Sequence, residues 1–149
     1  MIYYDRVQTE RPLQVYLPVG SHTPAWCTSS GKLYLSSLRR EQRLRIINNL
    51  PLRQFARNTL TDAGELEAAL LKIRADDLGT DNEEFVDGLV ACAVPVKDRH
   101  GRLFACLFAH APLIRKSLDE LLSYVPLLRE AAAELGQLID HADEATTEV

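Results

Sequence analysis

The spacing of hydrophobic positions changes along the chain and marks out two pairs of extended segments. Residues 2–7 and 14–19 are short runs rich in Tyr, Val and Ile with a polar stretch between them, which predicts an N-terminal hairpin. Residues 89–97 and 102–110 flank a turn that ends at Gly101, which predicts a second hairpin. Both of these later runs are apolar at nearly every position, so we expect a central strand pair covered on both faces.

Helical spacing predicts the segments between and after the hairpins. Residues 28–38 begin with three possible N-caps and continue with leucines, and a helix over residues 41–49 cannot continue past Pro51. The clearest helix covers residues 63–78, because Asp62 and Glu65 have capping-box spacing and Gly79 stands at the position of a C-cap.

Apolar positions at helical spacing predict a last helix that runs nearly to the C-terminal end of the chain. Ser117 and Glu120 form another capping box, and the apolar positions recur to Leu138, with Pro126 expected to break or kink the helix. From Asp140 onward the residues are polar and acidic, which predicts a frayed tail.

The order of elements favours an α+β domain with an antiparallel sheet flanked by helices. A chain of 149 residues suits one compact core, so we expect a single domain over residues 1–139 and a polar tail over residues 140–149. Rossmann-type winding is disfavoured because strands and helices do not alternate.

Composition narrows the classes of function. The 17 Lys and Arg against 21 Asp and Glu give a net charge of −4, which is unlike a nucleic-acid reader. The apolar runs are shorter than the roughly 18 residues of a membrane span, and the first residues lack a signal-peptide pattern, so we expect a cytoplasmic protein without membrane contact. The three cysteines are far apart and form no CxxC pair, so we expect no disulfide framework and no metal.

Motifs of common enzymes are absent, including GxSxG, HExxH and the phosphate-binding loop. Cys106 and His110 lie about 13 Å apart along a strand, too far to share an ion or a proton. Cys92 and Cys106 are therefore interpreted as small hydrophobic residues inside the sheet. The acids between residues 80 and 87 could supply a general acid and base, but a solvated connection is the favoured interpretation; they are Asp81, Glu83, Glu84 and Asp87.

One segment has the chemistry of an anion site. Residues 28–32, Thr-Ser-Ser-Gly-Lys, stand at a helix start, where backbone N–H groups, the helix dipole and an ammonium converge. An ordinary N-cap is the alternative interpretation. Gly31 costs about 1 kcal/mol relative to Ala inside a helix, which indicates that another part of the chain approaches the backbone there.

Several short motifs occur in one order along the chain. They are Val19-Gly20 with Pro24, Thr28-Ser29-Ser30-Gly31-Lys32, Asn58-Thr59-Leu60-Thr61-Asp62, Ile73-Arg74 through Gly79, Asp81, Glu84 and Gly88, and Ala93-Val94-Pro95-Val96 with Asp98 and Gly101. In this register, over about residues 3–138, the chain resembles the C-terminal effector-binding domain of the IclR (isocitrate lyase regulator) family of bacterial transcription factors.

The resemblance implies a GAF-like fold that binds a small organic acid beside the sheet, without a cofactor. The family's winged helix-turn-helix is absent from these residues, so we expect contact with DNA only through a missing N-terminal domain. It also implies a homo-oligomer, either a dimer or a tetramer. Carried over by position, the effector-binding residues are Trp26, Ser29, Ser30, Gly31, Asp81, Ala91, Phe108 and His110.

The departures from the family pattern concern the strands and the segment before the helix. Ala91, Phe108 and His110 stand where some members have a Cys and two Ser, and Trp26 replaces a frequent His. Aromatic walls and an imidazole suit a larger, partly apolar or aromatic carboxylate.

Two other classes of function stay open. One is an enzyme on a similar scaffold that uses Asp81 or Glu84 with His110, and the other is an oligomerisation module with a filled cavity. The sequence names neither the effector nor whether its binding activates or represses transcription.

Overall fold

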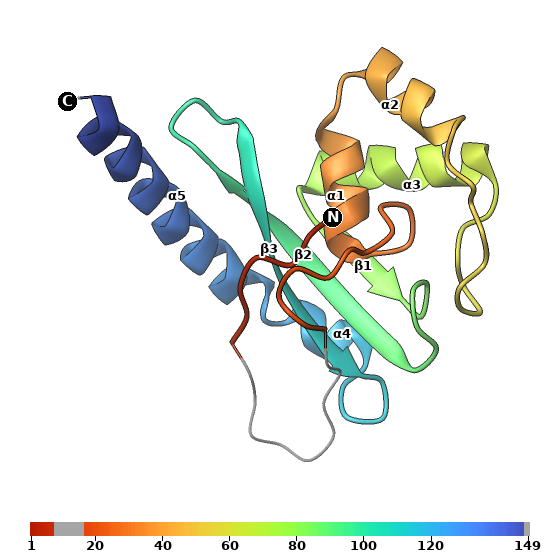
Figure 1. Cartoon of the computed structure of the whole chain (residues 1–149). Coiled ribbons are helices and arrows are strands. Elements are labelled where there is room, and N and C mark those ends of the chain that lie inside the picture. Colours follow the sequence, from red (N-terminus) through yellow and green to blue (C-terminus); the bar gives the residue numbers. More distant parts are fainter. Residues whose placement is uncertain (8–16, 148–149) are drawn as a thin grey trace.

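The structure is a computed structural model that describes residues 1–7 and 17–147, with side chains through Ile139. The elements in chain order are α1 (Ser29–Ser37), α2 (Arg40–Ile47), α3 (Ala63–Asp76), β1 (Gly79–Asn82), β2 (Leu89–Lys97), β3 (Leu103–Pro112), α4 (Leu118–Leu122) and α5 (Val125–Thr147). Figure 1 shows three layers, with the sheet between the helices α1 to α3 on one side and the helices α4 and α5 on the other. The α+β class and the antiparallel sheet are confirmed.

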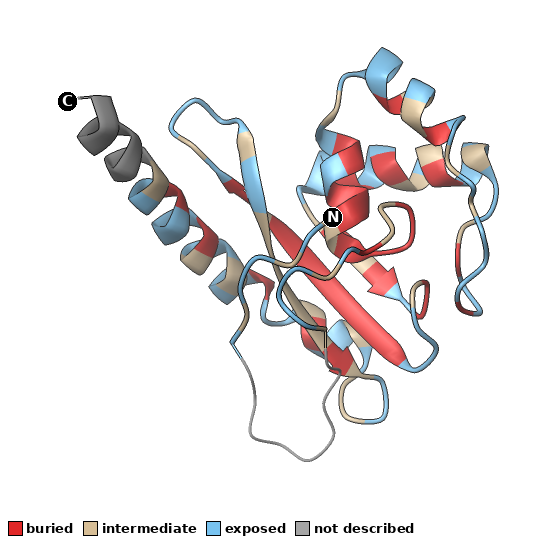
Figure 2. Ribbon diagram, in the orientation of Figure 1, coloured by how far each residue is buried: buried red, intermediate tan, exposed pale blue. Residues whose placement is uncertain are grey.

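Strand β2 is the centre of the sheet. The strand order is β1-β2-β3, and both pairings are antiparallel, with Asp81 opposite Ala91 and Ala91 opposite His110. Eight of the nine β2 residues are buried or partly buried, and Figure 2 shows the strand as a red band through the molecule. A strand buried on both faces reads as a continuous apolar run, which explains why its bounds follow from the sequence alone.

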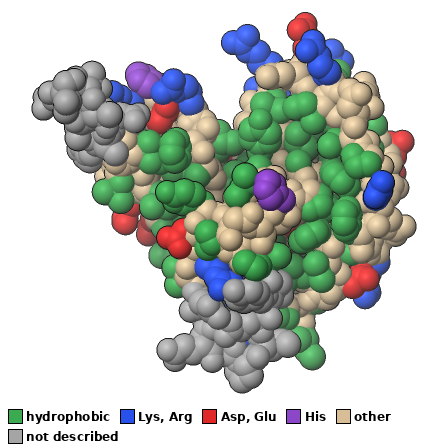
Figure 3. All heavy atoms as spheres, in the orientation of Figure 1, with side chains coloured by type: hydrophobic (Ala, Val, Ile, Leu, Met, Phe, Trp, Pro, Cys, Tyr) green, Lys and Arg blue, Asp and Glu red, His purple; other side chains and the backbone are tan. Residues whose placement is uncertain are grey.

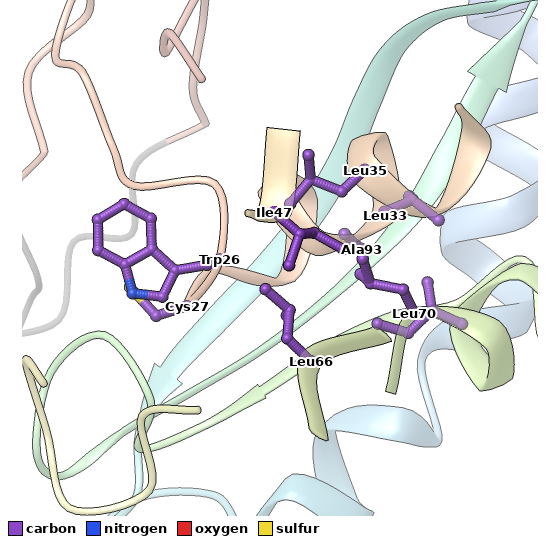
Figure 4. Packing of buried hydrophobic residues seen from close by; sticks show 9 residues of the cluster. Trp26, Cys27, Leu33, Leu35, Ile47, Leu66, Leu70 and Ala93 are labelled. Carbon is purple, nitrogen blue, oxygen red and sulfur yellow. The ribbon is translucent and has the colours of Figure 1, made fainter. Parts of the chain in front are cut away.

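The sheet separates two hydrophobic clusters. On the side of α4 and α5, the buried residues include Val90, Cys92, Val94 and Val96 of β2, which alternate along the strand. On the other side, α1, α2 and α3 pack on Ala93. Figure 4 shows this second cluster, in which Trp26 lies beside Cys27 at the end nearest the loop that precedes α1.

Capping fixes the ends of the helices. Thr28 caps α1 by accepting the N–H of Gly31, and Asp62 caps α3 by accepting the N–H of Glu65. The capping box at Ser117 and Glu120 is complete. The predicted C-cap at Gly79 is wrong, because Asp77 takes the left-handed conformation at φ 48° and ends α3 two residues earlier.

The N-terminal hairpin is wrong for the residues that the structure describes. Ile2 forms only an isolated bridge with His22, and residues 3–7 and 17–19 are not strands; residues 14–16 lie outside the described part. Short runs rich in Tyr and Val favour a strand only when a partner edge pairs with them along their length.

Three further predictions need correction at the sheet and at the last helix. Strand β3 is an edge strand, with Phe104 68% exposed, rather than one of a central pair. The acidic segment after α3 begins with a strand, β1, instead of a loop. The break near Pro126 is confirmed because α4 ends at Leu122, but α5 continues to Thr147, past the start of the expected tail.

The surface carries a notch between the side of α5 with the hairpin and the side of α1 to α3, and hydrophobic side chains line both of its walls (Figure 3). Within the described residues, no helix is long and apolar enough to cross a membrane.

Candidate functional site

A small cavity lies between the N-terminus of α1 and the face of the sheet. Its volume is about 20 Å³, enough for about one water molecule. The lining comes from six separate segments and consists of Tyr3, Leu17, Thr28, Ser29, Ser30, Asp81, Phe85, Leu89, Ala91, Phe108 and His110. Residues more than one hundred positions apart in the sequence therefore meet at one point.

The start of α1 forms one wall. The Thr28 hydroxyl accepts the N–H of Gly31 at 3.2 Å, and the Thr28 carbonyl accepts the N–H of Lys32 at 2.9 Å. The first N–H groups of a helix have no partner inside it, so, as far as the described residues go, those of Ser29 and Ser30 remain as donors at this positive end of the dipole.

Two glycines let the chain pack closely around this wall. A Cβ atom on Gly31 would lie 2.5 Å from the Cα of Ala25, so the expected close approach at this position is confirmed. A Cβ atom on Gly79 would overlap the carbonyl oxygen of Ser29. Gly79 is therefore needed where β1 passes under α1, and this close packing brings Asp81 to the cavity.

Asp81 is the acidic group of the cavity. Its side chain is 2% exposed, and one carboxylate oxygen accepts the backbone N–H groups of Glu84 at 2.8 Å and Phe85 at 3.4 Å. Burial raises the pKa of Asp81 from 3.8 to about 6, although these hydrogen bonds act in the opposite direction. The carboxyl group is therefore half protonated near pH 6 rather than near pH 4.

The acids beside Asp81 are structural and mostly buried, so the interpretation as a solvated connection is wrong for three of the four. The Nζ atom of Lys32 lies 2.5 Å from both carboxylate oxygens of Glu84, and both side chains are at least 90% buried. The Glu84 carbonyl accepts the Thr59 hydroxyl, which ties this loop to the segment before α3. Glu83 is buried as well, while Asp87 is exposed.

The opposite wall is aromatic. Phe108 and His110 project from the same face of β3, with ring centroids 5.8 Å apart. The Tyr3 ring meets Phe108 edge-on at 5.1 Å. Burial lowers the pKa of His110, so its imidazole is neutral near pH 7 and offers one donor and one acceptor.

The cavity contains six of the eight residues predicted to bind the effector, namely Ser29, Ser30, Asp81, Ala91, Phe108 and His110. Trp26 lies elsewhere: it is 7% exposed, its ring packs on Phe55, and its Nε1 donates to the Arg53 carbonyl at 3.3 Å. Gly31 is also outside the lining and acts through its packing on Ala25.

Five lining residues were not among the predicted site residues: Thr28 and Leu89 at the ends of elements, and the apolar Tyr3, Leu17 and Phe85, which sequence reasoning missed altogether. Tyr3 and Leu17 were placed in an expected hairpin, and nothing in their spacing shows which way each side chain points. Phe85 was missed because the segment that contains it was interpreted as a solvated loop. All three supply apolar area, so the wall is still rich in aromatic residues without Trp26.

A second hollow, of about 350 Å³, lies between the tip of the hairpin and α5. Its lining includes Lys97, Arg99 and Arg129, but Lys97 pairs with Asp77 and Arg129 donates to the Asp76 carbonyl. Among the residues with described side chains, no three His, Cys, Asp or Glu form a group that could hold a metal ion.

Comparisons with known proteins agree on one family. The model of the bacterial transcriptional regulator IclR C-terminal family matches residues 1–137. The protein named "Probable transcriptional regulator SauR" of Cupriavidus necator is 42% identical over 91% of this chain and 54% of its own length. The chain thus spans about half the length of that relative.

Solved structures give the same result. A double mutant of the inducer-binding domain of the PobR transcription factor from Acinetobacter, in complex with 3-hydroxybenzoic acid, matches 87% of this chain and 75% of its own with 33% identity and a TM-score of 0.81. The C-terminal domain of the E. coli transcriptional regulator KdgR matches 82% of this chain and 74% of its own with 31% identity and a TM-score of 0.75.

The fold and the cavity beside its sheet define a domain of the class found in bacterial transcriptional regulators. This chain belongs to the IclR C-terminal family. The resemblance seen in the sequence motifs is confirmed.

Proposed function

We propose that the cavity between α1 and the sheet binds an aromatic or partly apolar carboxylic acid and that this chain is the effector-binding domain of a transcriptional regulator. The observation that carries the proposal is the meeting of Ser29 and Ser30, Asp81, and the pair Phe108 and His110 in one cavity. Donors for an anion thus face an aromatic wall.

Each group has a distinct task in this proposal. The N–H groups of Ser29 and Ser30 hold the carboxylate at the positive end of the α1 dipole. Asp81 accepts a hydroxyl of the acid or, when protonated, donates to its carboxylate. Phe108 supplies apolar area, and the neutral imidazole of His110 bonds a second polar group.

The family comparison supports the chemical class of the ligand. The double mutant of the Acinetobacter PobR domain, 33% identical to this chain, was solved with 3-hydroxybenzoic acid. An aromatic acid with a hydroxyl substituent would use every wall of the present cavity. The start of α1 would then contact the carboxylate, and β3 would supply the aromatic surface.

Binding is tested by thermal unfolding with 3-hydroxybenzoate, 4-hydroxybenzoate and the matching hydroxybenzamides. At one hundred times its dissociation constant a ligand stabilises the fold by about 2.7 kcal/mol, which corresponds to roughly 5 to 10 °C for a domain of this size. The amides lack the carboxylate and should give much smaller shifts. The absence of a shift with any carboxylate up to millimolar concentration would contradict the proposal.

Matched variants locate the acid. Ser30→Leu, at the cavity, should abolish the shift, whereas Ser37→Leu, at the exposed end of the same helix, should not. Asp81→Ala should also abolish it, with the exposed Asp87→Ala as its control. His110→Phe should change which acids bind, because the donors of α1 remain.

A filled cavity in an oligomerisation module is the second candidate, and it is the one that would need no opening of the free volume of about 20 Å³. The same thermal series separates the two candidates, because a filled cavity gives no shift with any acid. An enzyme is distinguished by product analysis after prolonged incubation with each acid that binds. We propose that the acid is recovered unchanged, since the matched relatives are regulators.

We further propose that the chain associates as a dimer or tetramer and reaches DNA only through a DNA-binding domain outside these residues. Exposed leucines on α5 support self-association: Leu127 is 64% exposed and Leu138 is 65% exposed. Sedimentation should show species larger than 16.7 kDa at high micromolar concentration. Sequence-selective binding of this chain alone to duplex DNA would contradict the second part.

A further inference from the structure

The volume of the cavity is far below what an aromatic acid needs. Small-molecule sites usually measure some 300 to 1,000 Å³, and the free space here is about 20 Å³. A hydroxybenzoate therefore enters only if part of the lining moves. The lining residues differ greatly in how firmly the rest of the fold holds them.

Most of the lining is anchored in the fold. Strands β2 and β3 are hydrogen-bonded along their length, and α1 packs against α3 and all three strands through buried leucines. The N-terminal segment is different: among the described residues, none before Ala25 belongs to either hydrophobic cluster. Its displacement would therefore remove no member of either cluster, although Tyr3 covers Phe108 at the edge of the cluster that contains Ala93.

Tyr3 is the residue of this segment that enters the cavity. Its ring meets Phe108 edge-on at 5.1 Å, while its neighbours point outward, with Ile2 61% exposed and Tyr4 93% exposed. Two backbone hydrogen bonds set this direction, from the N–H of Tyr3 to the Ser21 carbonyl at 3.1 Å and from the N–H of Gly20 to the Tyr3 carbonyl at 2.8 Å.

The phenol also has electrostatic contact with the site. Burial and then the charge of Asp81 raise the pKa of Tyr3 to about 12, so the ring lies partly desolvated and within the field of the same carboxylate that faces the cavity. An aromatic ring with a hydroxyl group thus lines the cavity together with Asp81 and packs directly on Phe108.

We propose that Tyr3 is a specificity-determining plug, whose ring fills the place of the ring of an aromatic acid and must leave before such an acid binds. The inference rests on the proposed function of the cavity. A small carboxylate such as acetate has no ring, so it needs the donors of α1 and some movement of the lining, but not the place that the Tyr3 ring fills. Tyr3 therefore weakens the binding of large acids and not of small ones.

The size of the effect follows from the population of the open state. If the plug is out of the cavity in about a tenth of the molecules, the apparent dissociation constant of a large acid is about tenfold higher than that of an open cavity. Tyr3→Ala removes the plug and should lower the Kd of 4-hydroxybenzoate by about tenfold. The Kd of acetate should change less than twofold.

Calorimetric titration of the full chain compares four proteins, the wild type, Tyr3→Ala, Tyr3→Phe and Tyr4→Ala. Tyr3→Phe keeps the ring and should keep the wild-type ratio of the two dissociation constants. Tyr4→Ala removes an exposed ring from the adjacent position and should do the same. An unchanged or higher Kd of 4-hydroxybenzoate in Tyr3→Ala, with binding intact in the wild type, would overturn the plug and leave the proposed function standing.

A second measurement follows the ring itself in the unsubstituted protein. The chain has five tyrosines, so labelling with 3-fluorotyrosine gives at most five ¹⁹F signals, and Tyr3→Phe identifies that of Tyr3. Saturating 4-hydroxybenzoate should move this signal toward the position of the exposed Tyr4, and acetate should not. A Tyr3 signal that stays in place while 4-hydroxybenzoate binds overturns the inference. If no protein in the series binds either acid, the proposed function fails and the plug fails with it.

Discussion

Replacing Asp81 with Asn should stabilise the protein in a manner that depends on pH. Asn has nearly the shape of Asp, and its side-chain oxygen can still accept the N–H of Glu84, which lies 2.8 Å from the present carboxylate. The substitution removes the charge and turns the second carboxylate oxygen into an NH2 group, at a residue that is 2% exposed. The stability difference between the two proteins therefore reports the cost of the buried carboxylate.

The sign and size of this cost come from the pKa. Burial raises the pKa of Asp81 from 3.8 to about 6. Well below pH 3.8 the group is protonated in both the folded and the unfolded chain and costs nothing. As the pH rises, the unfolded chain loses the proton first, so native stability falls until the pH passes about 6. The full loss is about 3 kcal/mol, at 1.36 kcal/mol for each pKa unit.

Urea unfolding at pH 4.5 and pH 7.5 measures the effect. Linkage between these two pKa values gives an advantage for Asp81→Asn of about 1 kcal/mol at pH 4.5 and about 3 kcal/mol at pH 7.5. Asp87→Asn, at an exposed site in the same loop, is the control and should show no such trend. An advantage of Asp81→Asn that is equal at both pH values would refute the claim that a buried carboxylate titrates here.

Three more predictions concern the packing and charges around the site. Gly31→Ala places a Cβ atom 2.5 Å from the Cα of Ala25 and should lower the free energy of unfolding by about 1 to 3 kcal/mol, measured by urea unfolding. Gly64→Ala in α3 is the control and should change this free energy by less. Lys32→Met leaves a buried carboxylate without its partner, so we expect a loss of about 3 to 5 kcal/mol, partly restored by adding Glu84→Gln; equal losses in the single and double variants would count against it. Burial raises the pKa of the Cys27 thiol to about 12, so a thiol reagent at pH 8 should label it only after unfolding, as mass spectrometry of the labelled peptide would show.

The sequence by itself determined the bounds of those helices and strands that depend only on neighbouring residues. Strand β2 was predicted with the bounds that the structure gives, because a strand buried on both faces is apolar throughout. The starts of α3 and α4 followed from the capping residues Asp62 and Ser117. The glycine at position 31 indicated a close approach before its partner was known.

Residue motifs in a fixed order also identified the family and so gave eight expected site residues, six of which line the cavity. What they could not give is the direction of a side chain in an irregular segment. Tyr3 has no period to show that it points inward while Ile2 and Tyr4 point outward; that direction depends on hydrogen bonds to the Gly20 and Ser21 backbone.

Only the tertiary structure decided which charges are buried and which walls meet. The acids from Asp81 to Asp87 look like a solvated loop in the sequence, but β1 pairs with β2 and carries Asp81 under α1, where Lys32 neutralises Glu84. Trp26, an aromatic residue just before α1, turns instead into the hydrophobic cluster. The sequence by itself determined the elements and the family, because capping and periodicity are local. The cavity depends on contacts between residues far apart in the chain, and those contacts exist only once α1, the sheet and the N-terminal segment have packed together.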